Sequence, residues 1–177
     1  MKRRSFLFGS LLAIPNSIRD FFQDKKRGVI VLAGKDRFDT PVKLGPNLSH
    51  VKVSSEDTHG ALAIFENIGN QSGPPLHMHP NQDEIFHILG GRVLFQVGQD
   101  RMELQTGDTL FAPRGVPHAF LKIGDTPARM YITYQPAGKI EAFYKRVSEF
   151  QQLPSEAEFK KVFEDHDMKM VGPRLTP

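Results

Sequence analysis

A series of short apolar runs, each ended by Gly, Pro, Asn or Asp, constrains the fold of this chain more than any other feature. Such runs at close and regular spacing are typical of strands in an all-β sandwich or barrel. A helical period of useful length does not occur before residue 139. The expected strands are Val29–Leu32, Val51–Val53, Ala61–Ile68, Ile85–Leu89, Arg92–Val97, Met102–Leu104, Thr109–Ala112, Ala119–Ile123 and Met130–Tyr134.

The end of the chain follows a different pattern. Apolar residues in Ile140–Phe150 recur at offsets of three and four, which predicts an amphipathic helix. Ser155 and Glu158 form a capping-box pattern that opens a second helix, with Phe159 and Phe163 on one face. We therefore expect a barrel over residues 29–140 and a helical extension over residues 141–177 that packs on it.

The charge of the chain argues against a nucleic-acid partner, although the isoelectric point is near 9.2. Residues 1–28 carry seven Lys and Arg against two Asp and Glu, whereas residues 29–140 carry ten against eleven. The expected barrel therefore has no basic stripe that could follow phosphates. The chain has no Cys, so any metal must be held by His and carboxylates.

The N-terminal segment predicts export. Lys2-Arg3-Arg4-Ser5-Phe6-Leu7 precedes an apolar run that ends at Ile14, too short to span a bilayer, so stable membrane insertion is not expected. The segment resembles a twin-arginine export signal, which implies that residues 1–28 are a signal and linker and that the protein is periplasmic. The alternative is a basic amphipathic end on a cytoplasmic protein, because no small-x-small cleavage pair follows the run.

Two histidines and a glutamate in residues 73–84 are candidate metal ligands. His77 and His79 are two residues apart, so on a strand both imidazoles point to one face. Glu84 lies five residues after His79, an odd spacing that would place it on the opposite face of a straight strand. Pro80-Asn81-Gln82-Asp83 is suited to a turn, after which Glu84 can return to the same ion.

A fourth candidate ligand, His118, follows the turn-rich stretch Pro113-Arg114-Gly115-Val116-Pro117. A ligand at the start of a strand after a rigid turn is held with little loss of entropy. Three neutral imidazoles and one carboxylate form a ligand set of net charge −1, which suits one divalent Mn, Fe, Co, Ni, Cu or Zn ion. These residue types do not distinguish among the six metals.

These two stretches resemble the two sequence motifs of the cupin superfamily. His77-x-His79, Glu84 and the following Gly91 resemble the first motif, and Gly107-x5-Pro113-x-Gly115-x2-His118 resembles the second. Two positions depart from the motifs without touching a ligand. Three residues instead of five separate Gly73 from His77, and Lys122 stands where the second motif often has Asn.

The resemblance implies a jelly-roll barrel, the cupin double-stranded β-helix, with the metal inside it. It implies that His77, His79, Glu84 and His118 hold the metal. The closing segment from Phe163 to Pro173 resembles the tail of bacterial cupins described as quercetin dioxygenase-like. His87 is three residues after Glu84 and is expected to face away, while His50, His59 and His166 are expected on the surface.

Strand geometry predicts an aromatic wall beside the metal. Gly90-Gly91 can form a two-residue hairpin turn that pairs Phe86 with Phe95. Both would then lie on the same side as Glu84, and Phe120, two residues after His118, would join them. We interpret Phe86, Phe95 and Phe120 as a substrate pocket for a flat organic compound.

The opposite face of this hairpin would show Ile85, Leu89 and Leu94. Three aliphatic side chains on an outward face require cover. A second subunit is the expected cover, which predicts a homodimer. The C-terminal helices are the alternative.

Two hypotheses for function follow. The first is a metal-dependent dioxygenase, an oxidoreductase that acts on a flavonol-like or other enolic aromatic small molecule, with Glu84 as ligand and catalytic base. The second is a non-redox cupin that binds a small molecule and uses the metal for structure or recognition. An oxalate-type reaction is disfavoured because the aromatic wall offers nothing to hold a small dianion, and a sugar-nucleotide epimerase would not need this ligand quartet.

Overall fold

A computed structural model of the protein describes residues 28–44, 47–69, 73–150, 152 and 154–176. The proposed export signal therefore lies almost wholly outside the described residues. The chain divides into a unit Met1–Ile30 and a unit Val31–Pro177, and the fold described below is that of the second unit. Within the described ranges, no helix has the length and hydrophobicity that a membrane crossing requires.

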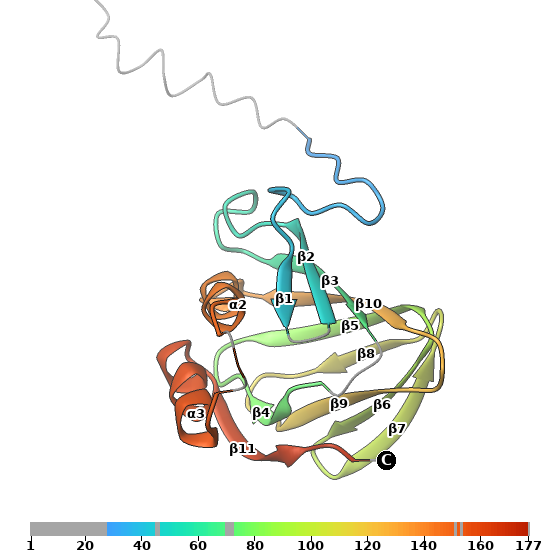
Figure 1. The fold of residues 1–177 in the computed structure, drawn as a ribbon, viewed down its shortest axis with the longest axis vertical. Coiled ribbons are helices and arrows are strands. Elements are labelled where there is room, and N and C mark those ends of the chain that lie inside the picture. The colour runs from blue at the N-terminus through green and yellow to red at the C-terminus, as the bar shows by residue number, and fades with distance from the viewer. Residues whose placement is uncertain (1–27, 45–46, 70–72, 151, 153, 177) are drawn as a thin grey trace, which may run out of the picture. The chain divides into compact units, whose positions relative to one another are not determined.

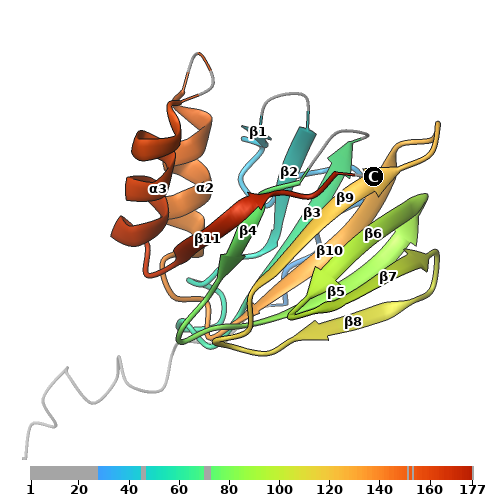
Figure 2. The same cartoon turned by 90° about the horizontal axis from the view of Figure 1, so that it is seen from below.

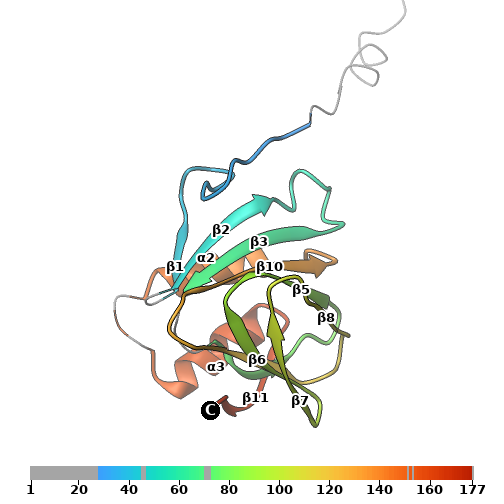
Figure 3. The same ribbon diagram turned by 90° about the vertical axis from the view of Figure 1, so that its right-hand side faces the viewer.

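Two antiparallel β-sheets form the second unit (Figure 1). The six-stranded sheet contains, in spatial order, β1 (Val42–Leu44), β2 (Asn47–Val53), β3 (Ala63–Gly69), β10 (Ala128–Gln135), β5 (Asp83–Gly90) and β8 (Thr109–Ala112). The five-stranded sheet contains β11 (Lys169–Arg174), β4 (Pro75–Met78), β9 (His118–Ile123), β6 (Arg92–Val97) and β7 (Asp100–Gln105). The six-stranded sheet arches over the other (Figure 3), which confirms the expected all-β jelly-roll architecture.

Both predicted helices are present. They are α2 (Ile140–Ser148) and α3 (Glu156–Asp165). Ser155 caps α3, since its side chain accepts a hydrogen bond from the Glu158 backbone while the Glu158 carboxylate accepts one from the Ser155 backbone, as the capping box predicts. The two helices lie side by side, α2 against β1 and α3 against β11 (Figure 2).

The hydrophobic core lies between the two sheets. Alternate residues of each strand point inward, so the inward face of each central strand contributes to this core, and β9 is buried on its outer face as well. Burying one such side chain stabilises the fold by about 1.5–3 kcal/mol, so these residues provide the main driving force for closing the sheets over one another. The core includes Phe65, Phe86, Ile88, Val93, Phe95, Phe120, Met130, Ile132, Tyr134, Tyr144 and Phe163.

Strand prediction was wrong at both ends of the chain. Val29–Leu32 forms no strand, and Ile30 and Leu32 are 87% and 66% exposed, because these apolar residues have no sheet partner. Strands β1, β4 and β11 were not predicted. Strand β11 contains Gly172-Pro173, which argues against a central strand but is tolerated at a sheet edge, where β11 lies.

The predicted hairpin across Gly90-Gly91 was also wrong. Strand β5 pairs with β8 and β10, whereas β6 pairs with β7 and β9 in the other sheet. Gly91 has a φ of 75°, and a Cβ there would lie 2.7 Å from Cα of Ala128, so this position requires Gly at the crossing between sheets. Phe86 and Phe95 still meet, because they face each other across the core instead of sharing one sheet.

The expected outward aliphatic face is consequently divided between the two sheets. Ile85 and Leu89 are half-buried on the outer face of the six-stranded sheet. Leu94 lies on the five-stranded sheet and packs in a small separate cluster with Leu121 and Leu175. The C-terminal segment therefore covers Leu94, whereas Ile85 and Leu89 stay half-buried on the outer face of the six-stranded sheet.

Candidate metal centre

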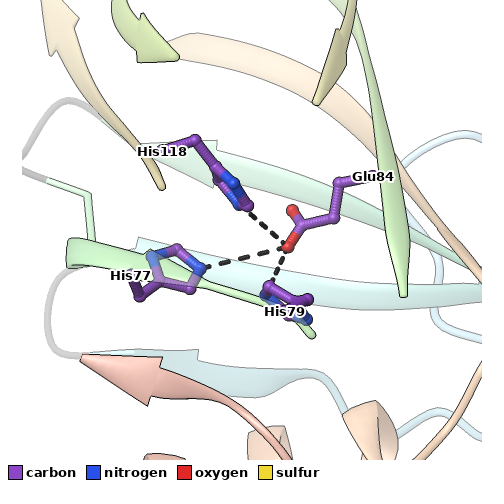
Figure 4. A group of neighbouring side chains, drawn as sticks. All are labelled: His77, His79, Glu84 and His118. Carbon is purple, nitrogen blue, oxygen red and sulfur yellow. Dashed lines mark hydrogen bonds and ion pairs between the residues drawn. The ribbon is translucent and has the colours of Figure 1, made fainter. Parts of the chain in front are cut away.

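The four expected ligands converge inside the barrel (Figure 4). His77 comes from β4, His79 directly follows β4, Glu84 comes from β5 and His118 begins β9. One ligand atom from each lies within 4.8 Å of every other. All four residues are buried, between 2% and 5% exposed.

A turn at Pro80-Asn81 carries the chain from one sheet to the other between His79 and Glu84, as the odd spacing of these two ligands requires. This turn is joined to the turn that precedes His118. The Gly115 backbone N–H donates to the His79 carbonyl at 2.8 Å.

An exposed ion pair adds a second link between these turns. The Arg114 side chain donates to both carboxylate oxygens of Asp83, at 3.1 and 2.6 Å, and its backbone N–H donates to Oδ1 at 2.8 Å. The hydrogen bonds from Arg114 lower the pKa of Asp83 to about 2. The two sequence motifs are therefore fixed to each other just outside the cluster.

A single oxygen of Glu84 faces the three imidazoles. Oε1 lies 2.5 Å from Nε2 of His79, 3.2 Å from Nε2 of His118 and 3.9 Å from Nε2 of His77 (Figure 4). His77 and His118 are also direct cross-strand neighbours. The strand pairing and the Pro80-Asn81 turn thus direct one nitrogen of each ring toward the same point.

The opposite nitrogen of each imidazole has a hydrogen-bond partner that can only accept. Nδ1 of His77 donates to the Pro75 carbonyl at 2.9 Å, and Nδ1 of His118 donates to the Val116 carbonyl at 3.0 Å. Nδ1 of His79 lies 2.6 Å from the side-chain amide oxygen of Gln82. In the neutral rings this leaves the Nε2 lone pairs for the centre, which is the form that binds metals.

The arrangement of donor atoms fits a cation. Nε2 of His79 is buried and has no hydrogen-bond partner among the described residues, although it lies 2.5 Å from Oε1 of Glu84. Two electron-rich atoms at this separation repel each other unless a positive charge lies between or beside them. Three imidazole nitrogens and one carboxylate oxygen are suitable ligands for a divalent transition metal.

The electrostatics favour an ionised Glu84 and a neutral His77, whereas they favour the charged form of His118. Burial lowers the pKa of His77 well below its ordinary value, and the neighbouring His118 and His79 rings lower it further. Burial alone would raise the pKa of Glu84, but His79 and His118 outweigh that effect and hold it well below its ordinary value. For His118, attraction and hydrogen bonding to Glu84 outweigh burial and raise the pKa.

An aromatic layer lies directly next to the cluster. The rings of Phe86, Phe95 and Phe120 have centroids between 4.9 and 6.0 Å apart, and the Phe86 ring lies 6.1 Å from that of His118. On another side of the cluster, Phe163 of α3 makes an edge-on contact with His77 at 5.3 Å. The candidate metal ligands therefore lie in aromatic surroundings.

Several residues at the site were not predicted. Gln82 contacts His79, Tyr134 lies opposite Glu84 on β10, and Phe163 covers His77. Gln82 lies between two predicted ligands, which is the only sequence signal for it. The other two depend on strand pairing and helix packing that a single sequence does not reveal.

The remaining histidines largely follow expectation. His87 is exposed and faces away from the cluster, and His59 is exposed. His166 is half-buried at the end of α3, and its Nδ1 bonds the Val162 carbonyl at 2.7 Å. His50 was expected on the surface, but it is only 7% exposed because β2 lies between β1 and β3.

The family comparison agrees with the fold and with the ligand cluster. Residues 65–134 match the family model described as a cupin domain. This stretch contains all four candidate ligands and strands of both sheets. The chain therefore contains a cupin domain over residues 65–134.

Two curated relatives are described as uncharacterized proteins. MJ1618 of Methanocaldococcus jannaschii is 34% identical over 61 residues, which is 34% of this chain and 49% of that protein. YrkC of Bacillus subtilis is 30% identical over 82 residues, which is 43% of this chain and 41% of that protein. The matches span about half the length of these relatives or less.

Solved structures share the fold. A predicted oxalate decarboxylase from Thermotoga maritima has a TM-score of 0.56 and 20% identity, covering 61% of this chain and 99% of that protein. KdgF from Halomonas sp. has a TM-score of 0.53 and 12% identity, covering 62% and 94%. At these identities the similarity concerns the fold alone.

Proposed function

We propose that the protein is a metal-dependent dioxygenase that acts on a flavonol-like or other enolic aromatic compound. The observation that carries the proposal is the position of the candidate ligands, whose Nε2 atoms and carboxylate oxygen converge directly beside the aromatic layer. A bound divalent transition metal would supply a Lewis acid that lowers the pKa of a coordinated substrate oxygen. The aromatic rings favour a flat, apolar substrate over a small dianion.

Glu84 is the proposed base. Its contacts with the three imidazoles all use Oε1, so its other carboxylate oxygen can accept the substrate hydroxyl proton. The low pKa of Glu84 keeps the side chain ionised at neutral pH. A base held beside the reacting oxygen is typically worth about 10²–10⁴-fold in rate.

Oxygen uptake tests this role. The wild-type protein, loaded in turn with Mn, Fe, Co, Ni or Cu, should consume dioxygen with at least one of a panel of enolic aromatic compounds. Glu84→Gln should lower the turnover rate by about 10²–10⁴-fold. Glu103→Gln makes the same chemical change at an exposed residue of β7 and should keep wild-type turnover. Equal rates for the two variants would contradict the proposed base.

The second candidate function is a non-redox, small-molecule-binding cupin in which the metal serves structure or recognition. The close packing around the cluster favours the structural role for the metal, since Phe86 and Phe95 are 1% exposed and Phe120 is 7% exposed. Under this alternative, metal-loaded protein binds a ligand but gives a flat oxygen-electrode trace with every metal and compound. Under the dioxygenase proposal, side chains that cover the cluster, such as Phe163, must move to admit substrate.

The Thermotoga maritima protein is described as a predicted oxalate decarboxylase, but the aromatic layer of this chain does not suit that reaction. A small dianion would require cationic side chains beside the metal. Among the described residues facing the core, Lys122 is a buried cation, but it lies four residues beyond His118 along β9, with Phe120 between them. We therefore retain an aromatic substrate class.

We further propose a homodimer formed through the outer face of the six-stranded sheet. Phe111 on β8 is 56% exposed and lies directly opposite half-buried Ile85 on β5, with Leu89 further along the same strand. Light scattering should give twice the chain mass, and Phe111→Glu should give the monomer mass. A monomeric wild-type protein would contradict this proposal.

Export by a twin-arginine-type signal in residues 1–28 is also proposed, on the sequence of that segment alone. Replacing Arg3 and Arg4 with Lys keeps the charge but should retain the protein in the cytoplasm. Fractionation of the native host separates the two locations. A wild-type protein found in the cytoplasm would contradict export.

A further inference from the structure

The side chain of Gln82 connects a candidate metal ligand to the chain segment that leads into α2. Its Oε1 lies 2.6 Å from Nδ1 of His79. Its Nε2 donates to the carbonyl oxygens of Pro136 and Ala137, each at 2.7 Å. Gln82 is 9% exposed, so water does not easily substitute for these bonds.

These contacts permit one orientation of the amide. The carbonyls of Pro136 and Ala137 can only accept, so both must face the NH₂ group of Gln82. The amide oxygen is then left for His79, and it too can only accept. Nδ1 of His79 must therefore carry the hydrogen, which leaves the Nε2 lone pair directed at Glu84 and the centre of the cluster.

His79 differs in this respect from the other two imidazoles. His77 and His118 donate from Nδ1 to backbone carbonyls only two residues away, which the local chain holds in place. His79 depends on a side chain that could rotate, and carbonyls 54 and 55 residues further along the chain hold that side chain. Tertiary structure therefore determines which nitrogen of His79 carries the hydrogen.

We propose that Gln82 is a positioning residue that fixes which nitrogen of His79 carries the hydrogen, and thereby sets the affinity of the cluster for its metal. The inference rests on the proposed metal site and deepens it. Partners of this kind typically change metal affinity by about 10–100-fold when removed. A neutral amide also leaves the ligand set at net −1, whereas a carboxylate partner would add a charge.

A purely structural role for Gln82 predicts a different outcome. In that case the important bonds are those to Pro136 and Ala137, which hold the turn after His79 against the start of the α2 segment. Gln82→Glu loses both of these donors but keeps an acceptor for His79, whereas Gln82→Met loses donors and acceptor together. The two variants therefore separate the roles.

Zinc affinity of the full chain, measured by competition with a chelator, gives the first readout. The proposal predicts that Gln82→Met weakens Zn²⁺ binding by about 10–100-fold and that Gln82→Glu stays within about threefold of wild type. Gln96→Met makes the same change on β6, away from the cluster, and should bind Zn²⁺ as wild type does. Equal weakening in both Gln82 variants, or wild-type affinity in Gln82→Met, would overturn the proposal.

The hydrogen position gives a second readout that needs no metal. Long-range ¹H–¹⁵N correlation spectra of metal-free protein at about pH 8, where an ordinary imidazole is neutral, report the tautomer of each ring. Wild type and Gln82→Glu should show the hydrogen on Nδ1 of His79, and Gln82→Met should show a mixture. An unchanged tautomer of His79 in Gln82→Met would overturn the role proposed for Gln82. Failure of the wild-type protein to bind any metal would instead overturn the proposed function.

Discussion

Replacing the buried Lys122 should remove a specific pH dependence from the stability of the barrel. Lys122 lies on β9 beyond Phe120, is 5% exposed, and donates to Oδ1 of Asn67 at 2.5 Å. Burial lowers the pKa of Lys122 from an ordinary value of 10.5 to about 8. The folded protein therefore binds the proton on this amine less tightly than the unfolded chain does.

The magnitude follows from this pKa difference. At about 1.36 kcal/mol per pH unit, folding disfavours the charged amine by about 3 kcal/mol. Because the folded-state pKa is depressed, the full penalty applies below about pH 8 and disappears as the pH rises through the unfolded-state value near 10.5. Between about pH 7 and pH 9.5 the unfolding free energy should rise by about 2 kcal/mol from this group alone.

Urea denaturation of wild type and Lys122→Met at these two pH values measures the effect. Met keeps the length of the side chain and removes its charge, although Asn67 then loses a donor. That loss is the same at both pH values and cancels when the pH dependences are compared. Wild type should gain about 2 kcal/mol relative to Lys122→Met on going from pH 7 to pH 9.5. Parallel pH dependences would contradict the lowered pKa of Lys122.

Three further predictions concern the cluster and its surroundings. Metal bound at pH 7 should be lost on dialysis at about pH 3, because protons compete for the imidazole nitrogens, and an unchanged content by elemental analysis would exclude these ligands. Tyr144→Phe removes the hydroxyl that lies 2.9 Å from the buried Tyr134 hydroxyl, so urea unfolding should show a loss of about 1–3 kcal/mol in the free energy of unfolding. The variant with both Tyr134→Phe and Tyr144→Phe should lose less than the sum of the two single changes. Asp83→Asn removes the ion pair to Arg114 between the two turns that precede Glu84 and His118. It should weaken Zn²⁺ binding, measured by chelator competition, by less than tenfold. An affinity equal to that of wild type would show that this ion pair does not position the candidate ligands. In wild type the hydrogen bonds from Arg114 keep Asp83 ionised below the ordinary Asp pKa of 3.8, so the ion pair is lost only as the pH falls through about 2.

The cluster of candidate ligands could be predicted from sequence because the spacing and turns that form it are local. The i, i+2 spacing of His77 and His79 and the turn before Glu84 are properties of a short segment. The turn that precedes His118 is equally local. Strand periodicity gave the correct inward face for Phe86 and Phe95 even though their predicted pairing was wrong, because alternation does not depend on which strand is the neighbour.

Long-range pairing could not be predicted from one sequence. A hairpin across Gly90-Gly91 and a crossing between sheets have the same local pattern, and only the close approach of Ala128 to Gly91 separates them. Strand β11 pairs with β4 about a hundred residues earlier and contains a Pro that argues against a strand. Gln82 was missed for the same reason, since its partners are carbonyls at the far end of β10.

We expect His77, His79, Glu84 and His118 to hold one metal ion inside the barrel. Crystals of protein purified without added metal, measured on both sides of the absorption edges of the first-row metals, test it directly through anomalous difference maps. We expect one strong peak per chain, about 2.0–2.2 Å from Nε2 of each histidine and from a carboxylate oxygen of Glu84. A peak bound through Nδ1, a peak held by other residues, or no peak at this cluster would contradict it.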